Sequence, residues 1–305
     1  MIPAHQPVLY QEIIHALRPR SGARYVDGTL GAGGHAAGLL AGSEPGGCLL
    51  GLDVDPQALE LARQKLAPFR ERAWLKKASY TSLPGQLAEL GWNSVDGILL
   101  DLGASSMQFD TPERGFSFLA DGPLDMRFDP SNPLTAAKII NEWPEQELAD
   151  LLFRYGEEPA SRRIARAIIG ARPVSGTRQL AAVIEQVQPR RGPHHPATRT
   201  FQALRIAVNG ELESVEKILP LAVQALGPGG RLAVISFQSL EDRLVKEYFR
   251  REGKDCICPP RQPICTCGHT ASIKEITRRP ITPTEAEINQ NSRARSAKLR
   301  VAEKL

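Results

Sequence analysis

The stretch Arg24-Tyr-Val-Asp-Gly-Thr-Leu-Gly-Ala-Gly-Gly34 decides the fold of this chain. Its first four residues predict a short apolar strand that ends at Asp27, and a helical pattern follows the glycine loop through Leu40. Glycines let a backbone pass close to a ligand, and the first amides of a helix have no partner within the helix. A strand, a glycine loop and a helix in this order favour a ligand site, although the loop alone also fits a plain tight turn.

Strand and helix patterns alternate beyond this stretch as far as residue 101. The alternation returns after residue 210 with a helix, a turn at 227–230, a strand, a helix and a final strand pair. Such alternation predicts an α/β fold with a doubly wound, mostly parallel, Rossmann-like sheet. The predicted strands are 24–27, 48–53, 74–78, 95–101, 231–235, 273–277 and 298–301, and the predicted helices among them are 58–66, 83–90, 211–226 and 241–251.

The segment from residue 111 to residue 204 has a different character. It contains no convincing buried strand, whereas residues 145–155, 160–169 and 178–188 have helical patterns separated by proline and glycine. We therefore predict one α/β domain made of residues 1–110 and 205–305, interrupted by an all-helical domain at 111–204.

Composition limits the class of protein. Of the 305 residues 42% are hydrophobic and 24% are charged, which is typical of a globular protein with a real core. The net charge of +4 is compatible with nucleic-acid binding without demonstrating it. Neither a bilayer-spanning apolar run nor a signal-peptide pattern is found, so we expect a cytoplasmic protein with no membrane partner.

Three aspartates end predicted strands. Asp27, Asp53 and Asp101 should meet at the carboxyl edge of the sheet, where such folds bind ligands. Asp53 also has the spacing expected of a carboxylate that holds ribose hydroxyls. Asp55 is an alternative ribose partner, and it equally stands where it could cap the helix that starts at Pro56.

The acids at this edge discriminate between two classes of cofactor. An NAD-dependent oxidoreductase has a pyrophosphate to hold, which clustered carboxylates would repel. S-adenosylmethionine has no phosphate, and acids suit its ribose and its cationic methionine end. Asp27 and Asp101 therefore favour S-adenosylmethionine, with the NAD-dependent oxidoreductase as the alternative.

Longer motifs carry a more specific signal and cover essentially the whole chain. They resemble the ribosomal RNA small-subunit methyltransferase H family. The matching segments are His5-Gln-Pro-Val-Leu9, Val26-Asp-Gly-Thr-Leu-Gly-Ala-Gly-Gly-His35, Gly51-Leu-Asp-Val-Asp-Pro56, Asp101-Leu-Gly-Ala-Ser-Ser-Met-Gln-Phe-Asp110, Gly115-Phe-Ser-Phe118, Leu124-Asp-Met-Arg127, Arg199-Thr-Phe-Gln-Ala-Leu-Arg-Ile-Ala-Val-Asn209 and Asn291-Ser-Arg-Ala-Arg-Ser-Ala-Lys-Leu-Arg300.

This resemblance implies an activity and a set of site residues. The implied reaction is methylation, by S-adenosylmethionine, of the exocyclic N4 of a cytidine in the decoding region of 16S rRNA. Tyr80 follows the third strand, where an aromatic ring can stack on adenine. One departure is Gln238, where the family pattern leads us to expect histidine, and we assign Gln238 no catalytic role. The implied cofactor contacts are Gly33, Gly34, His35, Asp53, Tyr80, Asp101 and Gln108.

The target amine sets the chemical problem, because its lone pair is delocalised into the cytosine ring. An oxygen that accepts the N4 hydrogens would increase its nucleophilicity and take up developing charge. Asp101, Ser105 and Ser106 are the candidate catalytic residues, and Ser236 is a further candidate oxygen. The serines are equally consistent with ordinary turn hydroxyls. Methyltransferases that act on DNA, protein or a small molecule stay open as alternatives.

The helical insertion is rich in cations, which suits a partner such as small-subunit rRNA or the small ribosomal subunit. Each of these residues alone is equally consistent with a solvated surface charge, and the histidine pair is interpreted as loop. The cations of the insertion and its exit are Arg162, Arg163, Arg166, Arg172, Arg190, Arg191, His194, His195, Arg199 and Arg205.

Four of the five cysteines fall within twelve residues: Cys256, Cys258, Cys265 and Cys267. Without a secretion signal this pattern favours metal or free thiols over disulfides. Four thiolates suit a structural zinc ion, although one residue separates the two cysteines of each pair where two residues are usual. Four unligated thiols are the alternative. His269 could replace one thiolate.

Overall fold

The computed structural model describes residues 7–189, 195–259, 262 and 264–305. The chain divides into two compact units, unit 1 (residues 1–103 and 212–305) and unit 2 (residues 104–211). Residues 104–110 and 205–211, which the sequence pattern places in the α/β domain, belong to unit 2 in the structure. Phe109 explains the first difference, because its side chain packs against the hydrophobic core of unit 2.

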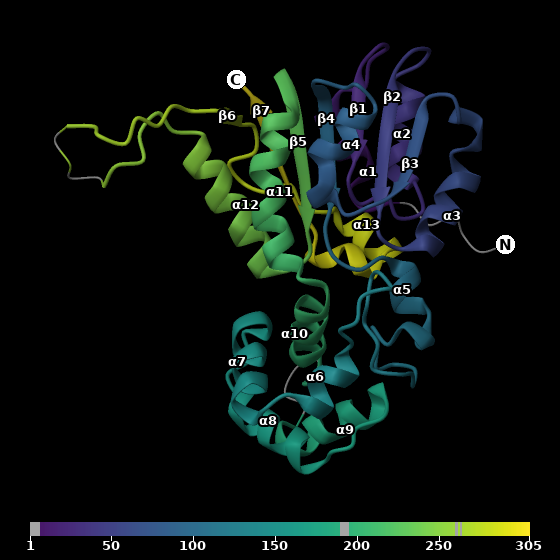
Figure 1. The fold of residues 1–305 in the computed structure, drawn as a ribbon, viewed down its shortest axis with the longest axis vertical. Helices are drawn as coiled ribbons and strands as arrows, with labels where there is room; N and C mark the ends of the chain where they lie inside the picture. Colours follow the sequence, from purple (N-terminus) through teal and green to yellow (C-terminus); the bar gives the residue numbers. More distant parts are fainter. Residues whose placement is uncertain (1–6, 190–194, 260–261, 263) are drawn as a thin grey trace. The chain divides into compact units, whose positions relative to one another are not determined.

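Unit 1 is built on one seven-stranded sheet (Figure 1). The strand order is β3-β2-β1-β4-β5-β7-β6; neighbours among the first five strands pair in parallel, and β7 pairs antiparallel with β5 and β6. The predicted α/β, doubly wound and mostly parallel sheet is thus confirmed. The strands are β1 (Arg24–Asp27), β2 (Cys48–Asp53), β3 (Ala73–Lys77), β4 (Val95–Asp101), β5 (Leu226–Ser236), β6 (Ile273–Glu275) and β7 (Lys298–Lys304).

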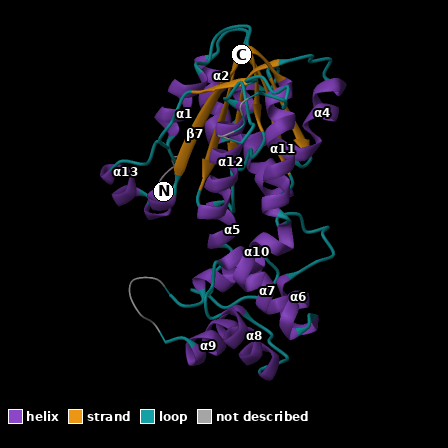
Figure 2. Cartoon of the chain, turned by 90° about the vertical axis from the view of Figure 1, so that its left-hand side faces the viewer, coloured by secondary structure: helices purple, strands orange, loops and turns teal. Residues whose placement is uncertain are grey.

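Helices cover both faces of this sheet (Figure 2). Alternate strand residues point to opposite faces, so Tyr25 packs with α1, α2 and α3 while Val26 packs with α4, α11 and α12. The strands are apolar on both faces for this reason. The helices of unit 1 are α1 (Tyr10–Leu17), α2 (Gly34–Gly42), α3 (Pro56–Lys65), α4 (Leu83–Glu89), α11 (Glu211–Ala225, whose first residue belongs to unit 2), α12 (Ser239–Glu252) and α13 (Glu285–Gln290).

One predicted turn is wrong. Residues 227–230 lie within β5 at a register shift, where Leu226 pairs with Val95 of β4 and the next pair is Arg231 with Gly97. The extra residues on β5 form an irregularity, and Gly229 occupies the left-handed region with φ of 76°. The glycine-rich residues that predict a turn therefore form the bulged start of β5.

Unit 2 is helical around its own core, which includes Leu148, Ile164 and Leu204. Among its described residues the only extended pairing is an isolated bridge between Pro123 and Gly176. Its helices are α5 (Ser106–Asp110), α6 (Ala136–Glu142), α7 (Glu145–Gly156), α8 (Ser161–Gly170), α9 (Thr177–Val187) and α10 (Thr198–Asn209). No helix in the described part of the chain is long and apolar enough to cross a membrane.

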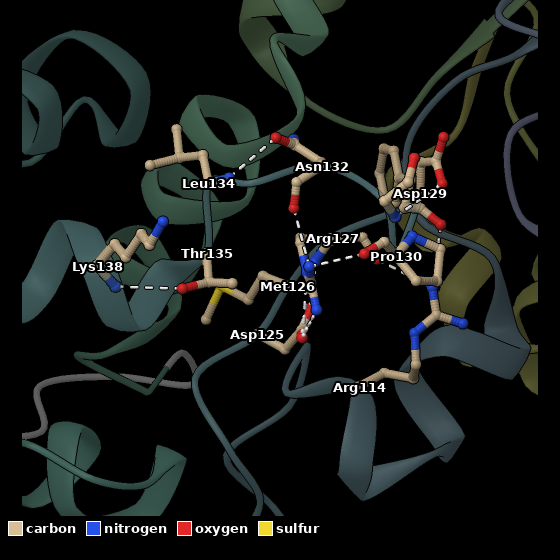
Figure 3. Close-up of polar contacts among 12 residues, drawn as sticks. Arg114, Asp125, Met126, Arg127, Asp129, Pro130, Asn132, Leu134, Thr135 and Lys138 are labelled. Carbon is tan, nitrogen blue, oxygen red and sulfur yellow. Dashed lines mark hydrogen bonds and ion pairs between the residues drawn. The ribbon is translucent and has the colours of Figure 1, made fainter.

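The loop before α6 in unit 2 is held by one arginine (Figure 3). Arg127 donates from Nε and Nη2 to the carboxylate of Asp125 at 2.9 and 2.7 Å, and from Nη1 to the carbonyls of Pro130 and Asn132. Met126 lies between the pair with φ of 62°, a strained conformation for a side chain of this size. The motif Leu124-Asp-Met-Arg127 thus organises a loop.

Candidate active site

Three aspartates end three neighbouring strands of the sheet. Asp27, Asp53 and Asp101 are the last residues of β1, β2 and β4, which are adjacent in the order β2-β1-β4. The three strands run parallel, so their carboxyl ends lie at the same edge. The structure therefore places these carboxylates together, as the sequence predicted.

Burial raises the pKa values of two of these acids into the neutral range. Desolvation, with a smaller contribution from the charge of Asp53, raises the pKa of Asp27 to about 7. Desolvation also raises the pKa of Asp101 to about 8, and the charges of Asp27 and Glu241 add to it. Both carboxyls are partly protonated near neutral pH, and a cation at this edge would favour their ionised forms.

One oxygen of Asp101 has no hydrogen-bond partner. Its Oδ1 is buried, and no described residue donates to it. The other oxygen, Oδ2, lies 3.8 Å from Nδ1 of His35, and the backbone N–H donates to Oγ1 of Thr29 at 2.6 Å. Buried acceptors in proteins are normally paired, so Oδ1 marks a position for the donor of a ligand.

His35 is buried and neutral. Its Nε2 lies 3.0 Å from the carbonyl oxygen of Val8, which can only accept, so Nε2 carries the proton. Nδ1 then presents a lone pair toward Asp101. Burial lowers the pKa of His35 to about 4, and the ring of Tyr10 stacks on it with centroids 6.3 Å apart.

Asp53 holds the glycine loop to the sheet. Its Oδ2 accepts from the N–H of Gly31 at 2.8 Å, and its Oδ1 accepts from the N–H of Asp55 at 2.8 Å. Burial raises the pKa of Asp53. Asp55 caps α3 by accepting from the N–H of Gln57 at 3.0 Å, which favours Asp53 as the ribose partner.

The glycine loop approaches its neighbours too closely for side chains. A Cβ on Gly28 would lie 2.7 Å from Leu100 and 3.1 Å from Cβ of Tyr80. Gly33 precedes α2 with φ of 77°, and a Cβ on Gly34 would lie 2.4 Å from Pro7. Tyr80 begins a short 3-10 turn (Tyr80–Ser82) directly after β3, so its half-buried ring starts beside the loop.

The predicted residues 105–108 lie in unit 2, where they start α5. Ser105 Oγ accepts from the N–H of Gln108 at 3.4 Å, and Gln108 Oε1 accepts from the N–H of Ser105 at 3.0 Å. This reciprocal capping gives Ser105 and the buried Gln108 a structural role. Ser106 is the first helical residue. Catalysis by the serines and cofactor binding by Gln108 stay predictions.

One polar group near the acids, Glu241, is not indicated by the sequence pattern. Glu241, buried at the start of α12, accepts from the N–H of Phe237 at 3.0 Å and from Nε2 of Gln238 at 2.9 Å. The oxygen of the same side-chain amide, Gln238 Oε1, is buried and has no hydrogen-bond partner among the described residues. Glu241 follows the end of β5 by five residues, and the sequence around it indicates only a helix. Ser236 ends β5, and its Oγ lies 3.5 Å from the carbonyl oxygen of Lys298.

These observations fit S-adenosylmethionine. Partly protonated acids gain most from a positively charged ligand, and this cofactor carries a sulfonium and an ammonium group. The pyrophosphate of NAD would add negative charge beside Asp27, Asp53 and Asp101. The glycine loop next to them leads into α2, whose N-terminus has no side-chain cap.

Comparison with known proteins decides between the two cofactor classes. The model of the MraW methylase family matches residues 3–305. The chain belongs to the MraW methylase family. It is 53% identical to the ribosomal RNA small subunit methyltransferase H of Dehalococcoides mccartyi, across 99% of this chain and 86% of that protein. Proteins of the same name from Heliobacterium mobile and Oleidesulfovibrio alaskensis are 50% and 49% identical, each across 99% of this chain and across 99% and 95% of those proteins.

Membership confirms the family resemblance found in the motifs, together with the prediction of an S-adenosylmethionine-dependent methyltransferase. Among solved structures, an rRNA methylase from Streptococcus thermophilus covers 100% of this chain and 99% of its own at 13% identity, with a TM-score of 0.45.

The predicted cations of this MraW-family chain divide into structural and surface residues. Arg172 donates to the carbonyls of Ile140 and Trp143 at the end of α6, and Arg205 pairs with the buried Glu211 at 2.8 Å. The guanidinium groups of these two arginines hold unit 2 together, and a phosphate contact by either of them stays a prediction.

The remaining cations lie at the surface or beyond the described residues. Arg162, Arg163 and Arg166 are exposed on α8. Arg166 pairs with Glu145 at 3.4 Å, and Arg163 donates to a backbone carbonyl. His195 pairs with Glu185 at 2.8 Å, and Arg199 is exposed. Residues 190, 191 and 194 lie outside the described part of the chain.

The cysteines of the MraW-family chain gather in one place, in the long connection between α12 and β6. Their Sγ atoms all lie within 4.8 Å of one another. None of them takes part in a disulfide. His269 does not join this group; its Nε2 lies 3.2 Å from the carbonyl oxygen of Arg251.

Proposed function

We propose that this chain transfers a methyl group from S-adenosylmethionine to the exocyclic N4 of a cytidine in the decoding region of 16S rRNA. The observation that carries the proposal is the set of desolvated acids at one sheet edge, two of them with pKa values in the neutral range, in a chain of the MraW methylase family. The names of its relatives support rRNA of the small subunit as the substrate.

The residues that would hold the cofactor come from three strands and the first loop. Asp53 would accept from the ribose hydroxyls through lone pairs that its two backbone donors leave. Asp27 and Asp101 would face the cationic methionine end of the cofactor, and Tyr80 would face its adenine. The loop before α2 would contact the cofactor through Gly33, Gly34 and His35. Gln108 is the remaining contact implied by the family.

The methyl group of a sulfonium is already activated, so the protein needs chiefly to align the acceptor and exclude water. A metal ion is unnecessary for this step, so a zinc ion at the four cysteines would be structural.

Asp101 is the residue best suited to act on the amine. Its unpaired Oδ1 can accept an N4–H, which increases electron density on the nitrogen and disperses positive charge as the new bond forms. The same carboxylate can take the proton that N4 releases once methylated. The bound cation favours the ionised form of Asp101, which is the form that can accept a hydrogen bond and then a proton.

We propose unit 2 as the RNA-recognition unit. Arg162, Arg163 and Arg166 form an exposed basic side of α8, and among the described residues Arg162 has no ion-pair partner. Phe153 on α7 is 63% exposed, and α7 packs against α8. An exposed aromatic ring and exposed arginines in the same unit suit a single-stranded RNA segment, with bases stacked and phosphates paired. The place of action would be the cytoplasm, where the small subunit is assembled.

The decisive experiment compares rRNA nucleosides from a deletion strain and its complemented derivatives. Mass spectrometry should show N4-methylated cytidine lost on deletion, restored by the native chain and not restored by Asp101→Asn. Persistence of the modification in the deletion strain would overturn the substrate. Titration of the purified protein with S-adenosylmethionine and with NAD tests the cofactor separately, and binding of NAD alone would favour the oxidoreductase.

A further inference from the structure

The four clustered cysteines have the geometry of a single tetrahedral metal site. Zinc binds thiolates at about 2.3 Å, so the edges of its tetrahedron are about 3.8 Å long. The Sγ atoms of Cys256 and Cys265 lie 3.5 Å apart, those of Cys258 and Cys265 4.0 Å, those of Cys265 and Cys267 3.5 Å, and those of Cys256 and Cys267 3.9 Å. These four distances bracket the expected edge.

We propose that Cys256, Cys258, Cys265 and Cys267 bind one Zn²⁺ ion as four thiolates. This site lies outside the methyl-transfer chemistry and does not depend on the proposed substrate. The backbone supports it, since the N–H of Ile257 points at Sγ of Cys267 with an N to S distance of 3.5 Å. An amide donor of this kind stabilises a thiolate.

The connection that carries the cysteines cannot fold by burial. No described residue between 253 and 272 is buried, and Ile257 and Ile264 are 45% and 76% exposed. A connection this long without a core of its own needs another source of order. Its base is held by polar contacts, among them Asp255 accepting from the N–H of Ala271 at 3.2 Å and the N–H of Ser272 donating to the carbonyl of Glu252 at 2.9 Å. A metal ion that cross-links two cysteine pairs would supply the order that packing does not.

The same distances argue against the other occupants of a four-cysteine site. Disulfides require sulfur atoms at about 2.05 Å, far shorter than the separations found. An iron–sulfur cluster places inorganic sulfide and several irons between its thiolates, which needs a wider cage than sulfur atoms all within 4.8 Å allow. A single tetrahedral ion remains, and zinc is the usual one for four thiolates.

The fifth cysteine supplies a matched control. Cys48 lies in β2, away from the quartet, with its Sγ 3.7 Å from the carbonyl oxygen of Gly46. Purified without chelator, the native protein and Cys48→Ser should each contain about one zinc per chain by elemental analysis. The double variant Cys258→Ser/Cys267→Ser should contain less than a tenth of that amount.

Hydrogen exchange then tests whether the ion orders the loop. Amides in peptides covering 253–272 should exchange at least tenfold faster in the double variant, while peptides covering β1 and β2 stay unchanged. Affinity for S-adenosylmethionine should also stay unchanged, which separates this proposal from the proposed function. Metal-free native protein with four reactive thiols, disulfides within the quartet, or stoichiometric iron would each overturn the zinc site; unchanged exchange would overturn its ordering role.

Discussion

Replacing Asp101 by asparagine should make the ligand-free protein less sensitive to rising pH. The pKa of Asp101 is raised to about 8, so the folded chain prefers the neutral carboxyl. Stability from that preference is fully present below a pH of about 4, the ordinary value of an aspartate, and is lost as pH rises through 8. The full difference corresponds to about 6 kcal/mol, which is a ceiling because 26% of the side chain is exposed.

The measurable part is the slope near neutral pH. One proton released on unfolding changes the free energy of unfolding by about 1.4 kcal/mol per pH unit. Between pH 6.0 and 7.5 the native protein should therefore lose roughly 2 kcal/mol more stability than Asp101→Asn. Asp27 is present in both proteins, so only the part of its titration that depends on the charge of Asp101 differs between them.

Urea unfolding at pH 6.0, 6.75 and 7.5 measures this slope, with Glu60→Gln as a control at an exposed position on α3. Saturating S-adenosylmethionine should remove most of the pH dependence of the native protein, because a cation favours the ionised acids. Parallel curves for the native protein and Asp101→Asn would refute the reasoning, since they would mean that Asp101 titrates normally.

Three further changes test other parts of the molecule. Asp53→Ala should raise the dissociation constant for S-adenosylmethionine at least tenfold by titration, since a charge-assisted hydrogen bond contributes about 1.5–3 kcal/mol, and an unchanged constant would point to Asp55. Neutralising Arg162, Arg163 and Arg166 together should weaken RNA binding and reduce the slope of log K against log salt by roughly 2, with cofactor affinity unchanged; equal loss of both would assign the arginines to the fold. Arg127→Lys should lower the free energy of unfolding of unit 2 by about 2 kcal/mol, because the bidentate contacts with Asp125 are lost, and should leave the affinity for S-adenosylmethionine unchanged. An unchanged free energy of unfolding would contradict the role of Arg127 in this loop.

The sheet and its acids could be predicted because their signals are local. Each strand is a short apolar run, and a parallel topology brings Asp27, Asp53 and Asp101 to one edge without any knowledge of side-chain contacts. The prediction of a turn at 227–230 was wrong because glycine is typical of a strand bulge as well as of a turn.

Other features depend on contacts between distant residues. Glu241 stands 140 positions from Asp101, and its effect on the pKa of that acid needs the pairing of β4 with β5. Arg172 and Arg205 have the same sequence signature as Arg162, yet they are anchored to carbonyls and to Glu211. Charge counting cannot separate structural arginines from those available to phosphates.

The buried charges of unit 1 finally show why the acids point to a cationic ligand. Elsewhere in this unit, charge at the sheet is matched: Arg300 pairs with Asp242 at 2.6 Å, and Arg231 pairs with Glu303 at 2.8 Å. No lysine or arginine in the described part of the chain pairs with Asp27 or Asp101, and the imidazole nearest to Asp101 is neutral. Buried acids without a partner destabilise a fold, so a sequence that keeps them must use them. A sulfonium compound supplies the positive charge that the chain itself does not.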